Sequence, residues 1–192
     1  MSQRILFIHG LASSGRFKMA DQLRILIKGA EVLAPDVPPE PETALAFLEA
    51  ACRDFRPGLI VGHSLGGFLA RWLKGIPKAL VNPTFSASPL LRFNMGEMKY
   101  LSPRADGAQS FMVTEELCRG FEELESVQFG MLTQEEKDLT TAFFADNDEI
   151  VRHRHIFERE YGKPGIRYPG THNPAYPEMK QYIVPVLKEI LI

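Results

Sequence analysis

The chain has few cysteines, no long apolar run and almost no excess of charge. Its only cysteines are Cys52 and Cys118, which form no metal-binding spacing and are too few for a disulfide scaffold, so we expect two buried thiols. A net charge of -2 gives no reason to expect nucleic acid or an anionic membrane as partner. The first apolar run, at 5–8, is too short for a secretory signal or a membrane span, so we expect a cytoplasmic location.

Short apolar runs alternate with amphipathic segments of helical length. The runs, each typical of a fully buried strand, lie at 4–8, 31–34, 58–62, 78–82, 139–145 and 165–168. Helices are predicted at 14–28, 41–55, 64–74, 149–161 and 177–191. We expect a kink or break just before Pro185, because proline removes a helical hydrogen bond. The alternation predicts an α/β fold, a six-stranded parallel sheet with helices on both faces, for which we expect the strand order 2-1-3-4-5-6.

Residues 86–138 interrupt this alternation, because they are much longer than an ordinary connection between a helix and a strand. The first half of the interval shows little periodicity. The second half indicates two helices, one capped by Thr114 and one opened by the capping box from Thr133 to Glu136. We expect one domain over 1–192, with this helical insertion as a cap that roofs a cleft at the sheet edge.

The pentapeptide Gly62-His63-Ser64-Leu65-Gly66 stands between a strand-like run and a helical segment. A strand that turns sharply into a helix around G-x-S-x-G exposes the serine oxygen above the sheet, and glycine is needed where a side chain would clash. The motif alone is a weak signal, because ordinary turns also use glycine and serine. Its position between strand and helix favours a nucleophile.

A serine nucleophile needs a base, and histidine is suited to this near neutral pH. Of the five histidines, His172 lies in the loop between the last predicted strand and the last helix. His153 and His155 open a charged helix and are expected at the surface. His63 should point away from the serine side chain, and His9 comes too early in the chain for the base in this topology.

The third member of such a site is a carboxylate that orients the base, expected after the fifth strand. Asp146, Asp148 and Glu149 are available there. Asp148 is the preferred acid, although it could equally cap the following helix. Ser64, Asp148 and His172 then follow three different strands in the chain order typical of α/β-hydrolases.

The loop after the first strand should meet the serine where the winding direction of the sheet reverses. The backbone amides of Leu11 and Leu65 are therefore the predicted oxyanion-hole donors. If Ser64 is not considered, His9-Gly10 is explained equally well as a tight turn at the end of the first strand. The residues expected to line the substrate cleft are His9, Gly10 and His63.

Several blocks of the sequence resemble the small YqiA-like esterases, bacterial α/β-hydrolases that are also catalogued as an uncharacterised protein family. These blocks are 6–14, 34–39, 61–67, 80–83, 113–117, 148–151 and 170–172. The resemblance covers essentially the whole chain. It implies a compact hydrolase that lacks the first two strands of larger relatives and uses Ser64, Asp148 and His172 as a triad. Asn173-Pro174 and the insertion depart from the pattern, which bears on substrate preference more than on chemistry.

The sequence thus predicts a serine esterase or thioesterase that acts on a small-molecule ester through an acyl-enzyme, with no metal and no organic cofactor. A peptidase or an acyltransferase on the same scaffold is the first alternative, because acyl-enzyme chemistry is common to all of them. A binding protein that keeps the fold without turnover is the second.

Overall fold

The computed structural model describes residues 3–130 and 132–191. Its main sheet has six parallel strands in the order β2-β1-β3-β4-β7-β8. The strands are β1 (Gln3–Ile8), β2 (Ala30–Leu33), β3 (Leu59–His63), β4 (Lys78–Val81), β7 (Thr140–Ala145) and β8 (Ile166–Tyr168). Counted within this sheet alone, the order is the predicted one, and each strand end lies within one residue of its predicted position. The fold class is confirmed.

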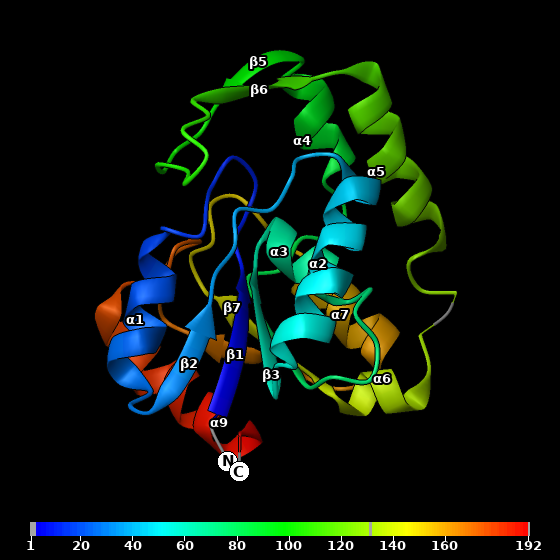
Figure 1. Ribbon diagram of the computed structural model, residues 1–192. Coiled ribbons are helices and arrows are strands. Elements are labelled where there is room, and N and C mark those ends of the chain that lie inside the picture. The colour runs from blue at the N-terminus through cyan, green and yellow to red at the C-terminus, as the bar shows by residue number, and fades with distance from the viewer. Residues whose placement is uncertain (1–2, 131, 192) are drawn as a thin grey trace.

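Helices cover both faces of this sheet (Figure 1). Side chains alternate along each strand, so Ile5 and Phe7 pack into one core cluster while Leu6 and Ile8 pack into the other. The first cluster lies under α1 (Lys18–Leu26) and the C-terminal helices. The second lies under α2 (Pro41–Phe55), α3 (Leu65–Ala70) and α7 (Arg154–Tyr161).

The last helical segment is continuous but changes its hydrogen-bond pattern just ahead of Pro185, where a kink or break was predicted. It consists of α8 (Tyr176–Glu178), the π-helix η1 (Met179–Ile183) and α9 (Val184–Ile190). The amide of Val184 donates to the carbonyl of Met179, five residues back. The π-helical turn changes the hydrogen-bond pattern just before Pro185, whose nitrogen has no hydrogen to donate.

Three predicted helices prove shorter in the structure. The predicted helix at 14–28 begins only at Lys18, and the one at 64–74 ends at Ala70. The predicted start at 149 is wrong, since α7 begins at Arg154. The reason for the last difference is Asp148, whose carboxylate accepts the amides that follow it and holds them in a loop.

Residues 88–113 of the insertion lie above the carboxyl ends of the strands, and the chain then descends to its last helix near their amino ends (Figure 1). The insertion contains α4 (Ser88–Phe93), β5 (Gly96–Lys99), β6 (Ser110–Val113), α5 (Glu115–Val127) and α6 (Gln134–Asp138). Both predicted caps are present, because Thr114 accepts from the amide of Leu117 and Thr133 from that of Glu136, each at 3.2 Å. The antiparallel β5-β6 pair was not predicted.

Both cysteines are free thiols on helices. Cys118 is buried as expected, whereas Cys52 is only half-buried. Within the described ranges, no helix has the length and apolar character needed to cross a membrane.

Candidate active site

Ser64 sits on a strained turn between β3 and α3. Its φ of 54° and ψ of -117° are unfavourable for a side-chain-bearing residue, and such strain clusters at functional sites. The turn is possible only with glycine beside it. A Cβ on Gly62 would lie 2.5 Å from the Gly66 carbonyl oxygen, and one on Gly66 would lie 2.0 Å from the carbonyl oxygen of the last residue of β1. Packing against β1 therefore fixes the turn that presents the Ser64 hydroxyl.

His172 and Asp148 are in direct contact. The imidazole Nδ1 lies 2.9 and 3.0 Å from the two carboxylate oxygens of Asp148, and both residues are 4% exposed. Nδ1 must be the donor if Asp148 is ionised, so in the neutral form of the ring Nε2 is the nitrogen without a proton. Sequence reasoning placed these two residues at the ends of neighbouring strands, and the structure brings them together.

Asp148 is held in its ionised form by hydrogen bonds. Burial alone raises the pKa of its carboxyl, but hydrogen bonds from His172 and from the amides of Val151 and Ile150 outweigh burial and keep the pKa below its ordinary value of 3.8. The two amide contacts are 2.7 and 2.8 Å long. Asp148 therefore both orients the imidazole and shapes its own loop, rather than capping a helix as the alternative interpretation had it.

His63 supports the backbone of His172 from below. Its Nε2 lies 2.9 Å from the His172 carbonyl oxygen, which can only accept, so His63 donates. The His63 ring stacks on Phe17 at 5.4 Å and approaches the His172 ring at 4.9 Å between centroids. Burial lowers the pKa of His63 to about 3, so this ring is neutral. The prediction that His63 points away from the serine side chain agrees with these contacts.

Asn82 is a residue of the site to which sequence reasoning gave no role. It follows β4 with a positive φ of 45°. Its Nδ2 donates to the His172 carbonyl at 2.8 Å and to the Tyr168 hydroxyl at 2.8 Å, while its Oδ1 accepts from the amide of Ala145 at 2.8 Å. One side chain thus links the ends of β4, β7 and β8. The available signal was a polar residue directly after a buried strand at the carboxyl edge.

His9 is buried directly after the end of β1. Its Nδ1 donates to the Gly10 carbonyl at 2.9 Å and its Nε2 accepts from the Val37 amide at 3.0 Å. Burial lowers the pKa of His9 to about 4. Both ring nitrogens are occupied, and His9 borders a small cavity of about 20 Å³ rather than the one beside Ser64. Gly10 and His63, by contrast, do line the cavity beside Ser64.

A cavity of about 360 Å³ opens beside Ser64 and His172. Its other lining residues are Gly10, Leu11, Ala12, Ser13, Phe17, His63, Leu90, Asn94, Met98, Lys99, Leu101, Ile150 and Asn173. The insertion contributes the segment from Leu90 to Leu101. Most of the lining is apolar, as in sites for small organic ligands.

The first loop approaches Ser64 closely, since a Cβ on Gly10 would lie 3.2 Å from the Ser64 Cβ. Leu65 is the first residue of α3, so its amide has no acceptor within the helix. In the described part of the chain, no acceptor is bonded to the amide of Leu11 either. Leu11 lines this cavity, and Leu65 directly follows Ser64, which also lines it.

Among the described residues, the Ser64 hydroxyl has no hydrogen-bond partner, His172 included. Serine–histidine contacts are often long without substrate and tighten when it binds. Both residues line one cavity. The described residues contain no cluster of three or more potential metal ligands.

The other two histidines differ in their surroundings. His155 is exposed, as expected. The prediction that His153 is a surface residue is wrong, because its ring is half-buried and its Nδ1 accepts from the amide of Phe85 at 2.9 Å.

The parallel sheet and the elbow at its centre define an α/β-hydrolase fold. The chain belongs to the family described as "Uncharacterised protein family (UPF0227)", which matches residues 4–161. This membership confirms the resemblance to the YqiA-like proteins.

Solved structures show the same fold at low sequence identity. An Arabidopsis methylesterase has a TM-score of 0.65 at 13% identity, covering 97% of this chain and 99% of its own. A putative hydrolase from Agrobacterium vitis S4 has a TM-score of 0.64 at 14% identity, covering 100% of this chain and 88% of its own. The N-acyl homoserine lactonase AidH has a TM-score of 0.61 at 14% identity, covering 99% and 90%.

Proposed function

We propose that this chain is a serine hydrolase that cleaves small-molecule carboxylic ester or thioester bonds. The observation that carries the proposal is the pairing of His172 Nδ1 with the Asp148 carboxylate at 2.9 Å, on the same cavity as the strained Ser64. A histidine that a carboxylate holds through one nitrogen, and that lines the same cavity as a serine on an elbow, can act as the base that activates the serine.

In the proposed reaction, the Ser64 oxygen attacks the acyl carbonyl carbon while His172 Nε2 takes the hydroxyl proton. Asp148 holds the imidazole in the required tautomer and stabilises its charged form. The amides of Leu11 and Leu65 donate to the oxyanion. The imidazolium then gives its proton to the leaving alcohol or thiol, and the acyl group remains on Ser64.

Water completes the cycle. His172 Nε2 removes a proton from a water molecule, whose oxygen attacks the acyl carbon, and the proton returns to Ser64 as the carboxylic acid leaves. No metal or organic cofactor takes part in this scheme. Each oxyanion donor typically contributes about 10² to 10³ in rate.

The cavity favours an apolar acyl group. Leu90, Met98 and Leu101 of the insertion face it together with Phe17 and Ile150. The insertion acts in this proposal as the cap of the cleft. The solved relatives include a lactonase and a methylesterase, which supports ester chemistry on this scaffold without identifying the substrate.

The test is labelling with a fluorophosphonate probe, which reacts with activated serines. Ser13→Ala is the matched control, because Ser13 lines the same cavity. We expect wild type and Ser13→Ala to be labelled and Ser64→Ala to stay unlabelled. Hydrolysis of aryl esters of increasing acyl length should fall in Ser64→Ala by about 10⁶ in kcat.

Labelling that persists in Ser64→Ala would contradict the assignment of the nucleophile. Absence of labelling in the folded wild-type protein would contradict the hydrolase proposal and favour the binding protein. Amines added as competing acceptors separate hydrolysis from acyl transfer, because a hydrolase gives free acid as the main product.

A further inference from the structure

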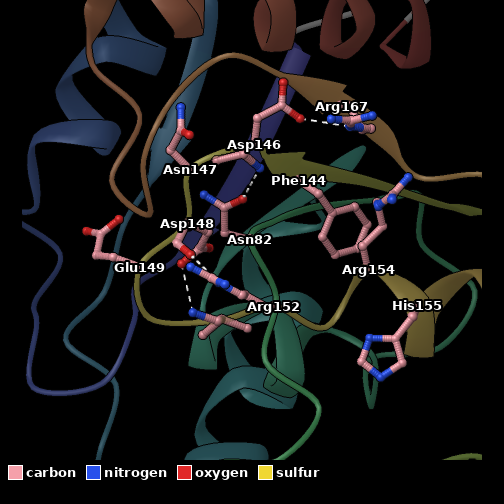
Figure 2. Close-up of a pocket in the computed structure, with 12 residues that line it drawn as sticks. Asn82, Phe144, Asp146, Asn147, Asp148, Glu149, Arg152, Arg154, His155 and Arg167 are labelled. Atoms are coloured by element: carbon pink, nitrogen blue, oxygen red, sulfur yellow. Dashed lines mark hydrogen bonds and ion pairs between the residues drawn. The ribbon is translucent and has the colours of Figure 1, made fainter.

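A second cavity, of about 450 Å³, lies on the other side of the loop that carries Asp148 (Figure 2). The two cavities share no lining residue, and the loop separates them: Ile150 borders the first, while Glu149 and Val151 border the second. We call the second one the arginine cavity. Its lining is Asn82, Phe144, Ala145, Asp146, Asn147, Asp148, Glu149, Val151, Arg152, Arg154, His155 and Arg167.

Each carboxylate that borders the arginine cavity accepts at least one hydrogen bond within the protein. Asp148 accepts from His172 Nδ1, and Glu149 accepts from the His172 amide at 3.1 Å. Asp146 accepts from Arg167 Nε at 2.8 Å. Among the described residues, only Asp146 Oδ2 and Glu149 Oε1 of these carboxylates receive no hydrogen bond.

The hydrogen-bond donors of this lining are not used up. Arg152 bonds a backbone carbonyl through Nε, Arg154 bonds a glutamate of its own helix through Nη1, and Arg167 bonds Asp146 through Nε. Within the described residues, the Nη groups of Arg152 and Arg167, the Nη2 of Arg154 and the His155 ring donate to no protein acceptor. The lining thus has more charged hydrogen-bond donors than free acceptors, which suits an anionic ligand with several oxygen atoms.

Two of the guanidinium groups belong to one end of the cavity. Figure 2 shows the Arg154 side chain extending toward Arg167. A Cβ added to Gly165 would lie 3.5 Å from Cγ of Arg154. The aliphatic part of the Arg154 side chain therefore packs against Gly165, which precedes Arg167 by two residues. The N-terminus of α7, an eight-residue helix that begins at Arg154, adds partial positive charge at the same place.

We propose that the arginine cavity binds a phosphate group, with Arg154 and Arg167 as the principal contacts and Arg152 as a third. Guanidinium forks match phosphate oxygens in pairs, which lysine does not do. The ligand is a free phosphate ion or a phosphomonoester, since both present the same oxygens. This inference concerns binding alone and stands whether or not Ser64 is a nucleophile.

The test is calorimetric titration of the whole chain with inorganic phosphate and, separately, with phenyl phosphate, near neutral pH. Sodium chloride of matched ionic strength controls for screening. We expect saturable binding at one site in wild type. The double variant Arg154→Gln/Arg167→Gln should weaken it at least about ten-fold, because charge-assisted hydrogen bonds are lost.

Arg159→Gln is the matched control, since Arg159 is an exposed arginine on α7 that pairs with Glu160 outside the cavity. This variant should bind as wild type does. Tighter binding of phenyl phosphate assigns a phosphomonoester, and equal affinity assigns the free ion.

Three results would overturn the proposal. These are no saturable heat from either probe, wild-type affinity in the folded double variant, or an equal loss in Arg159→Gln. Circular dichroism of each variant shows whether it is folded, and the three arginines are exposed, so their replacement leaves the core intact.

Discussion

Two buried neutral histidines should make this protein unusually sensitive to mild acid. The folded-state pKa is about 4 for His9 and about 3 for His63, against 6.5 without burial. Because the folded pKa lies below the unfolded one, the unfolded chain takes up protons first as pH falls. Stability is therefore complete above pH 6.5 and is lost as pH decreases toward the folded values.

The size of the effect follows from linkage. Each histidine that is protonated only in the unfolded state lowers the free energy of unfolding by about 1.4 kcal/mol per pH unit. Between about pH 6.5 and about pH 5, His9 and His63 together remove about 3 kcal/mol, because each unfolded histidine is only half protonated at the upper end of this interval. That is a large share of the roughly 5–15 kcal/mol that stabilises a typical domain. Asp148 does not contribute in this range, since its folded pKa lies below 3.8.

Urea unfolding followed by circular dichroism, at several pH values across this window, measures the slope. In His9→Gln, the side-chain oxygen of glutamine can accept from the Val37 amide. In His63→Gln, the side-chain nitrogen can donate to the His172 carbonyl. Each variant should lower the slope of the free energy of unfolding against pH by about half, once wild type and variant are referred to the same starting pH. His155→Gln, at an exposed histidine, should leave the slope unchanged. The reasoning is refuted if both single variants keep the wild-type slope.

Three further perturbations test the site and its support. Asp148→Asn should lower kcat for ester hydrolysis by about 10⁴, because an amide favours the wrong tautomer of the histidine; a loss below ten-fold in the folded variant would contradict the assigned role. Lys78→Met leaves the Glu136 carboxylate without its buried partner at 2.8 Å and should cost about 3–5 kcal/mol in urea unfolding, most of it recovered in Lys78→Met/Glu136→Leu. Gly66→Ala, whose Cβ would lie 2.0 Å from the Ile8 carbonyl oxygen, should destabilise the fold by on the order of 3 kcal/mol; unchanged unfolding would show that the elbow can relax.

The main sheet could be predicted closely because its strands are buried on both faces. Such strands read as continuous apolar runs, and all five residues of β3 are buried. The β5-β6 pair lacks this signal, since the residues of β5 alternate between half-buried and exposed and only one residue of β6 is buried. The start of α7 was misplaced because a side chain, Asp148, competes with the helix for backbone amides.

The candidate triad was accessible from sequence because its members follow strand ends in a recognisable order. The supports of His172 were not accessible. His63 and Asn82 reach its carbonyl across 109 and 90 positions of the chain, and no local pattern marks a hydrogen bond between such distant residues. The free donors of Arg154 and Arg167 likewise become visible only when their partners are known.

The low pKa of His63 has a place in the proposed mechanism. Acyl transfer through Ser64 puts a positive charge on His172, whose ring centre lies 4.9 Å from that of His63. A second charge on His63 would oppose this step. Burial, together with the charge of His172 itself, lowers the pKa of His63 to about 3, so the supporting ring stays neutral while the catalytic one is charged. The same burial that makes the fold sensitive to acid therefore protects the charged intermediate.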